Sequence, residues 1–177
     1  PVTWNETVER FGAVVIGARQ ILVAYNVNVD EKDAKTAKIA GSLVRSTGRL
    51  LKQEDGRRTR IPGMLPMVQG MGLPLEAHGI SQVSMNLRDV NVTPMHIAFE
   101  AVKSIVNDHG VETCGSELVG LVPLSAMIES GKWYAEDGCD DEKDLVNAAI
   151  KGLGLDKLGP FIANERIIEW ALKEAVE

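Results

Sequence analysis

The sequence predicts an α+β fold in which helices cover a four-stranded sheet. The chain has 177 residues, of which 45% are hydrophobic and 25% charged, as in a globular protein. Segments rich in β-branched residues alternate with segments whose apolar residues repeat at helical spacing. The order strand, helix, strand, strand, helix, strand is that of the ferredoxin-like split βαβ sandwich (βαββαβ), here with a helical C-terminal extension. In that arrangement the first and third strands lie side by side in the middle.

The first half of the chain supplies three of the expected strands. Residues 20–29 are rich in Val and Ile and predict the first strand, after which Asp30 is expected to cap a helix that fades near Gly48. Residues 64–70 form a short apolar run bounded by glycines and predict the second strand. Residues 80–88 alternate strictly in character and predict the third strand.

The second half supplies the remaining helices and the last strand. Thr93 is expected to act as N-cap, with Pro94 at the first position of a helix whose apolar stripe runs from Ile97 to Val106 and stops at Gly110. Residues 113–121 predict the fourth strand, and Pro123 opens another helix. Helical patterns over residues 142–152 and 164–176 predict the C-terminal extension.

Charge, cysteine content and hydropathy exclude several classes of protein. A net charge of -6 and a pI near 5.2 argue against general nucleic-acid binding, which depends on clustered Lys and Arg. The apolar runs are far shorter than the roughly 18 residues that a membrane span needs. Cys114 and Cys139 are too few for a disulfide framework and are expected to be free thiols. Together with the lack of a recognisable leader, they favour a cytoplasmic location.

One stretch of the chain is locally basic despite the acidic total. It carries Arg45, Arg49, Lys52, Arg57, Arg58 and Arg60 against only Glu54 and Asp55. A solvated helix end and loop is one interpretation, and a loop that faces an anion is the other.

Alternation along the two central strands divides their residues between two faces. The mainly apolar face of each strand should pack against the helices. The opposite, open face then carries Asn26, Asn28, Gln82, Ser84 and Asn86. Amides can recognise the donors and acceptors of a heterocycle or hold a second layer of protein, and a solvated face is the alternative. Glu117, which stands among apolar residues, is either half-buried against a partner or a site carboxylate.

The histidines show no pattern that points to chemistry. His78, His96 and His109 lack the spacing of a metal site, so no metal is expected and each is interpreted as a surface residue. His96 should fall on the solvent side of its helix.

Several blocks of this sequence resemble the glutamate formimidoyltransferase family. They are residues 12–28 (GAVVIGARQILVAYNVN), 68–72 (VQGMG), 82–87 (QVSMNL) and 115–123 (GSELVGLVP), followed by an ending from Gly154 to Glu169. The resemblance runs from about Phe11 to Glu169, with the blocks in the family's order. It implies two consecutive ferredoxin-like subdomains whose sheets face each other with a folate between them, usually in a homodimer.

On this resemblance, residues 1–19 are a linker from a missing N-terminal subdomain and residues 20–177 are the C-terminal subdomain. The implied activity is transfer of a formimino group between N5 of tetrahydrofolate and L-glutamate in histidine degradation, with tetrahydrofolate as a substrate. A non-catalytic module for folate binding or dimerisation is the alternative. An RNA-binding sheet is disfavoured because the open face carries no aromatic residue on its central strands.

The resemblance also assigns site residues. The family's catalytic histidine lies in the first subdomain, so no catalytic residue is expected in this chain. The residues implied to line the folate site are Phe11, Gly12, Ala13, Val14, Gly17, Arg19, Asn26, Asn28, Gln82, Ser84 and Asn86. Arg19 would suit a carboxylate of folate or glutamate, with a structural ion pair as the alternative.

Overall fold

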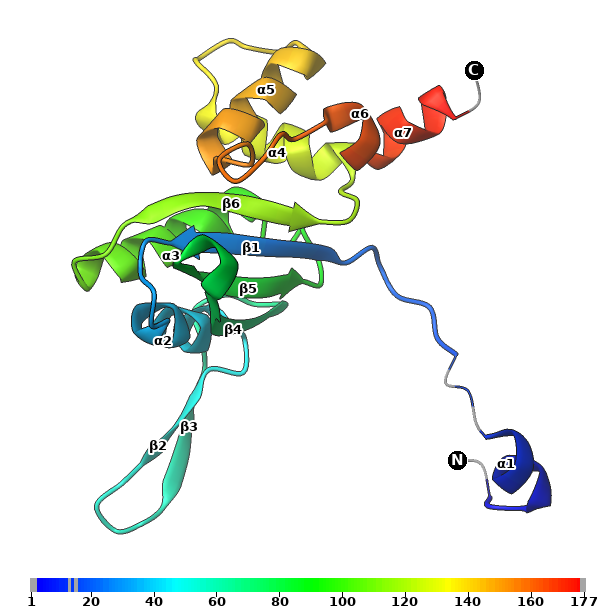
Figure 1. Ribbon diagram of the computed structural model, residues 1–177, viewed down its shortest axis with the longest axis vertical. Helices are drawn as coiled ribbons and strands as arrows, with labels where there is room; N and C mark the ends of the chain where they lie inside the picture. The colour runs from blue at the N-terminus through cyan, green and yellow to red at the C-terminus, as the bar shows by residue number, and fades with distance from the viewer. Residues whose placement is uncertain (1–2, 13, 15, 176–177) are drawn as a thin grey trace.

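A computed structural model describes residues 3–12, 14 and 16–175, and it has a mixed α/β architecture (Figure 1). Its main sheet is four-stranded, antiparallel and ordered β4-β5-β1-β6. The strands are β1 (Val23–Val29), β4 (Val68–Leu75), β5 (Ile80–Leu87) and β6 (Thr113–Val119), and a short 3-10 helix, η1 (Glu76–His78), joins β4 to β5. The helices are α1 (Glu6–Phe11), α2 (Lys35–Val44), α3 (Met95–Asp108), α4 (Leu124–Tyr134), α5 (Glu142–Leu153), α6 (Ala163–Arg166) and α7 (Ile168–Glu174).

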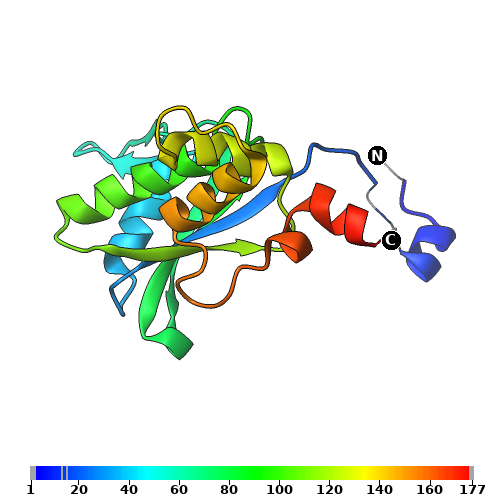
Figure 2. The same ribbon diagram turned by 90° about the horizontal axis from the view of Figure 1, so that it is seen from above.

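The core lies between the sheet and helices α2 and α3 (Figure 2), and it continues into α4 and α5, which contribute buried Met127 and Val146. Alternate residues of the two central strands, from Val23 to Val29 in β1 and from Val83 to Leu87 in β5, are buried together with Ala37, Val102 and other apolar residues of the two helices. The predicted division of β1 and β5 into an apolar, helix-covered face and a polar face is therefore confirmed. Burial of this apolar area is the main stabilising contribution to the fold.

Glycines let α2 approach the edge strand β4 closely. A Cβ added at Gly72 would lie 2.1 Å from the carbonyl carbon of Ala37, and one added at Gly41 would lie 2.6 Å from that of Met71. Backbone therefore contacts backbone, which no larger residue would permit. This contact fixes the position of β4 and of the polar residues on its other face.

Two predicted helix caps are wrong. Helix α2 begins at Lys35, and Glu31 rather than Asp30 supplies the local acceptor, because its carboxylate accepts from the Thr36 N–H at 2.8 Å and hydroxyl at 2.9 Å. The Thr93 hydroxyl donates to the Pro66 carbonyl at 2.7 Å, so it does not cap α3, which starts after Pro94. At α2 the neighbouring Glu31 takes the place of the expected cap, whereas α3 has no side-chain cap.

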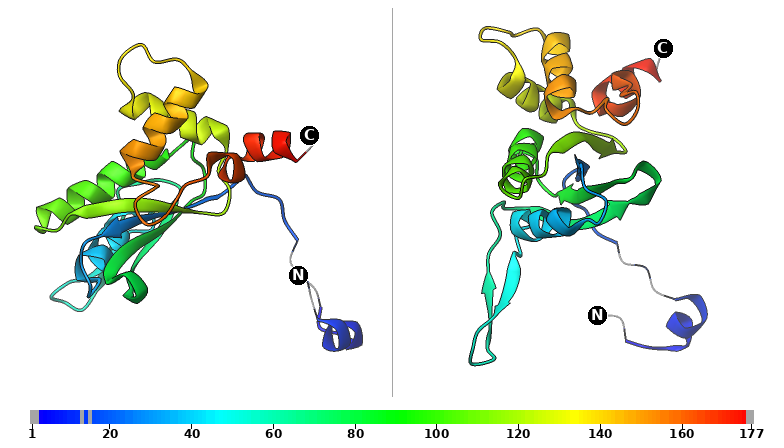
Figure 3. Two further views of the ribbon diagram at one scale, coloured as in Figure 1. Left: turned by 45° about the horizontal axis from the view of Figure 1, so that its top comes forward. Right: turned by 60° about the vertical axis from the view of Figure 1, so that its left-hand side comes forward.

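The largest differences from the predicted elements occur in three places. The second strand begins at Val68 instead of residue 64 and continues through Pro74, which an edge strand tolerates. The helix expected over residues 164–176 is divided at buried Ile167, which forms a parallel bridge with Val122. The basic stretch is a two-stranded hairpin of β2 (Arg49–Lys52) and β3 (Arg58–Ile61), whose strand residues are all exposed (Figure 3).

Two smaller predictions concern thiols and membrane spans. Cys114 and Cys139 are free thiols, as expected. Within the described part of the chain, no helix is both long and apolar enough to cross a bilayer.

Candidate functional site

The strand register places the polar residues in rows across the face opposite α2 and α3. Residues directly opposite each other in antiparallel strands share a face. One row runs Gln69, Asn86, Ala24, Val119; the next Met71, Ser84, Asn26, Glu117; and a third Leu73, Gln82, Asn28. We call these residues the polar face. It brings together all five strand residues that the sequence predicted and adds Glu117 from β6.

Part of the polar face is buried within the chain itself. Asn28 is 0% exposed, Gln82 4% and Asn26 8%, whereas Ser84 and Asn86 are half-buried and Glu117 is exposed. The fully solvated interpretation of this face is therefore wrong for the three buried amides. Glu117 is exposed in this single chain, so contact with a partner and a role as a site carboxylate both stay predictions.

A chain of hydrogen bonds links the buried amides to the exposed carboxylate. The Gln82 side-chain N–H groups donate to Asn28 Oδ1 at 2.8 Å and to Glu117 Oε2 at 3.1 Å. Asn28 Nδ2 is buried and has no partner among the described residues. Gln82 thus uses one N–H to orient Glu117 and the other to bind Asn28.

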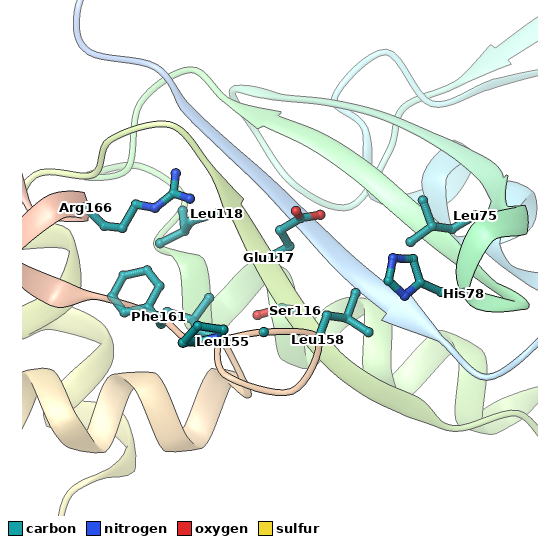
Figure 4. A pocket seen from close by; sticks show the side chains of 11 residues that line it. Leu75, His78, Ser116, Glu117, Leu118, Leu155, Leu158, Phe161 and Arg166 are labelled. Carbon is teal, nitrogen blue, oxygen red and sulfur yellow. The ribbon is translucent and has the colours of Figure 1, made fainter.

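Glu117 lines a cavity of about 280 Å³ beside the end of β4 (Figure 4). In Figure 4 its carboxylate lies between Arg166 and His78, and Leu75 lies beside His78. The volume is slightly below the roughly 300 to 1,000 Å³ of ligand pockets, so this cavity alone fits only part of a ligand.

A second cavity, of about 620 Å³, lies at the other end of β4. It is lined by Arg19, Gln20, Leu22, Met67, Gln69, Arg88 and Asp89. Within the described residues neither arginine forms an ion pair, so the structural-pair alternative for Arg19 has no support here. Two guanidinium groups in one cavity suit an anion such as a carboxylate.

The predicted residues from the N-terminal segment do not join the polar face. Phe11 is 75% exposed and Val14 84%, and Gly12 and Gly17 are also exposed. Figure 1 shows this segment leading away from the sheet. Ala13 lies outside the described residues. The folate-contact assignment for these residues stays a prediction, because no described element of this chain packs against them.

The prediction for His96 is wrong. The side chain is 5% exposed and stacks on Trp133 of α4, with ring centroids 5.1 Å apart. Burial lowers the pKa of His96, while the nearby carboxylates of Glu129 and Glu100 oppose that shift. The apolar pattern of α3 predicted which of its faces packs against the sheet. It did not predict that α4 covers another face of α3, where His96 lies. His78 and His109 are exposed, as expected.

Metal ligation finds no support in the geometry. The described residues contain no group of three or more His, Cys, Asp or Glu side chains that could hold an ion.

Comparison with known proteins gives one consistent result. A family model described as the formiminotransferase domain matches residues 24–173. The formimidoyltransferase-cyclodeaminase of Mus musculus is 37% identical over 175 residues, which cover 95% of this chain and 30% of the relative. The formimidoyltransferase-cyclodeaminase of Dictyostelium discoideum is 34% identical over 167 residues, which cover 93% of this chain and 29% of that relative.

A shorter relative has a related name. The glutamate formimidoyltransferase of Thermoplasma acidophilum is 32% identical over 144 residues, which cover 81% of this chain and 43% of that protein. The chain therefore spans less than half the length of each of these relatives. All of them are named as transferases.

Proposed function

The chain belongs to the formiminotransferase domain family, and we propose that it is the C-terminal subdomain of a glutamate formimidoyltransferase. In this proposal it holds tetrahydrofolate while a formimino group passes between N5 of the folate and the amino nitrogen of glutamate. Residues 20–177 form a ferredoxin-like subdomain, and residues 1–19 link it to an N-terminal subdomain that covers the polar face. The whole protein acts in the cytoplasm as a homodimer.

The layout of the polar face carries the proposal. Its two cavities lie at opposite ends of β4, between Gln69 and Leu75, which at 3.3 Å per residue is about 20 Å. Folate has a comparable extended length, with a hydrogen-bonding heterocycle at one end and carboxylates at the other. The buried amides Asn28 and Gln82 lie in the row of Leu73, toward the first cavity, and would face the heterocycle. Arg19 and Arg88 line the second cavity together with Asp89 and would face the carboxylates.

Exposed apolar side chains support a second protein layer. Trp4, Phe11 and Ile16 are exposed in the N-terminal segment, and Val119 and Met71 are exposed on the polar face itself. Large apolar groups on one side of a sheet commonly mark an interface. A covering subdomain would close the polar face into a tunnel and exclude water from the transfer.

The chemistry requires positioned reactants, dipoles that stabilise a tetrahedral intermediate, and a group that moves protons on nitrogen. The polar face supplies amides for the first two requirements. Its central strands, β1 and β5, carry no histidine or carboxylate. We assign proton transfer to the N-terminal subdomain.

The test is an assay of formimino transfer from N-formiminoglutamate to tetrahydrofolate, by the 177-residue chain alone and after addition of the N-terminal subdomain. We expect no transfer by the chain alone and transfer by the assembled protein. Transfer by the chain alone would contradict the assignment of the base. Folate binding without transfer in the assembled protein would instead support the non-catalytic folate-binding or dimerisation module.

A further inference from the structure

We infer that Glu117 binds the transferred group itself, as a cationic formamidinium, and thereby makes the protein prefer formimino over formyl groups. This inference rests on the proposed function. It assigns a specificity-determining residue on the polar face that the sequence left undecided between a partner contact and a site.

The two possible one-carbon groups differ in charge and in hydrogen bonding. A formimino group on nitrogen is an amidine, a strong base that is protonated at neutral pH and presents a planar set of N–H donors. A formyl group on nitrogen is a neutral amide whose carbonyl oxygen is an acceptor. A carboxylate can bind the protonated formimino group through charge-assisted hydrogen bonds. It repels the carbonyl oxygen of the formyl group, because both are hydrogen-bond acceptors that carry full or partial negative charge.

A hydrogen bond orients the Glu117 carboxylate and leaves one of its oxygens available to such a ligand. Its Oε2 accepts from Gln82, whose other N–H is bonded to fully buried Asn28, so the carboxylate has a defined position on the polar face. No described residue donates to Oε1. A group fixed through one oxygen pays less ordering entropy when the other binds a substrate.

The basic residues that line the same cavity form no ion pair with this carboxylate. His78 and Arg166 line the same cavity, yet the described residues contain no ion pair to Glu117. Arg166 instead donates to the carbonyl of Gly120 at 3.4 Å. The negative charge of Glu117 is therefore available at the cavity, which is large enough for a one-carbon group and part of a ring.

The location agrees with the orientation proposed for folate. Glu117 shares a row with Asn26 and Ser84, beside the buried amides, and the arginine-lined cavity lies at the far end of β4. With its carboxylates at the arginines, folate would bring its heterocycle, and the group on N5, toward Glu117.

The decisive experiment compares formimino and formyl transfer to tetrahydrofolate by the assembled protein carrying Glu117→Gln. We expect kcat/KM for formimino transfer to fall roughly 10- to 100-fold, as for loss of a hydrogen bond to a charged group, and that for formyl transfer to change less than about 3-fold. Glu117→Asp should retain part of the preference. The matched control is Glu112→Gln, an exposed carboxylate that lines neither cavity. An equal effect on both substrates, or on neither, would overturn the inference.

A second measurement separates this inference from the proposed function. The 177-residue chain is titrated with formamidinium chloride, and separately with formamide, while the side-chain amide signals of Gln82 are followed by NMR. We expect formamidinium alone to shift them and the shift to vanish in Glu117→Gln. If the assembled protein transferred neither group, the proposed function would fail, and this titration would still decide the assignment. Equal shifts in wild type and variant, or none in either, would refute it.

Discussion

The hydrogen bond between Gln82 and Asn28 makes a quantitative prediction about the polar face. Gln82→Met keeps the size of the side chain but removes the donor to Asn28 Oδ1, and Asn28 is 0% exposed. The Asn28 amide would then have no described partner for either polar atom, since Nδ2 already has none. Leaving a buried polar group unpaired costs about 1 to 3 kcal/mol, so we expect the free energy of unfolding to fall by that amount.

Removing both amides should cost less than the sum of the single changes. In Asn28→Leu, Gln82 keeps its bond to Glu117, so we expect a loss of about 1 kcal/mol or less. In the double variant no buried amide remains unpaired at this pair of positions. The coupling free energy in the double-mutant cycle should therefore be about 1 to 2 kcal/mol.

Urea unfolding of the chain followed by circular dichroism measures these quantities, provided that the m-value stays constant. Ser84→Ala is the control, because Ser84 lies on the same face but outside this network, and it should change stability by less than about 0.5 kcal/mol. Additive single changes, within about 0.5 kcal/mol, would mean that the two amides do not contact each other.

Three further predictions concern the core, His96 and the hairpin. Val83→Asp places an unpaired carboxylate against the helices and should abolish soluble folding, whereas a soluble variant with a cooperative melt would mean that the faces are exchanged. The pKa of His96 is lowered in the folded state, so as pH falls the unfolded chain binds the proton first. The free energy of unfolding should therefore decrease below about pH 6.5, and it should decrease less in His96→Phe. Equal pH profiles of the free energy of unfolding in the two proteins would contradict this. In stopped-flow measurements, changing Arg57 and Arg58 to Gln should slow association of a polyglutamylated folate with the assembled protein at low salt, with a smaller deficit at high salt; equal rates at low salt leave the hairpin as a solvated element.

The sequence predicted those features of the fold that depend on local periodicity. Strict alternation over residues 80–88 located β5 and divided its residues correctly between the two faces. The helical spacing of apolar residues likewise located α2 and α5. Period-2 and period-3.6 patterns persist whenever one face of an element is buried, whatever covers it.

Several of the errors arose where distant segments decide the local structure. Thr93 bonds to Pro66 instead of capping its own helix, and His96 is buried by Trp133 of another helix. Neither partner could be identified from spacing along one element. The basic stretch shows the same limit: its charges were evident, but its hairpin pairing depends on the register between Arg49 and Ile61.

The polar face shows how far a candidate site can be predicted without coordinates. Alternation predicted its amides, because Asn26, Asn28 and Gln82 interrupt otherwise apolar strands. The role of Glu117 stayed open because it depends on β6 pairing with β1 in one register, with a shift between Val27 and Val29. That register brings Glu117 to Gln82, 35 positions away in sequence.

The central claim is that the polar face binds folate, and the affinity of the assembled protein for tetrahydrofolate tests it most directly. Asn26→Leu and Asn86→Leu each remove an amide from this face without changing the helix-covered core. We expect each to raise the Kd by about 5- to 100-fold, as for a lost hydrogen bond of 1 to 3 kcal/mol, and to lower the free energy of unfolding by less than about 1 kcal/mol. An unchanged Kd in both folded variants would contradict the claim.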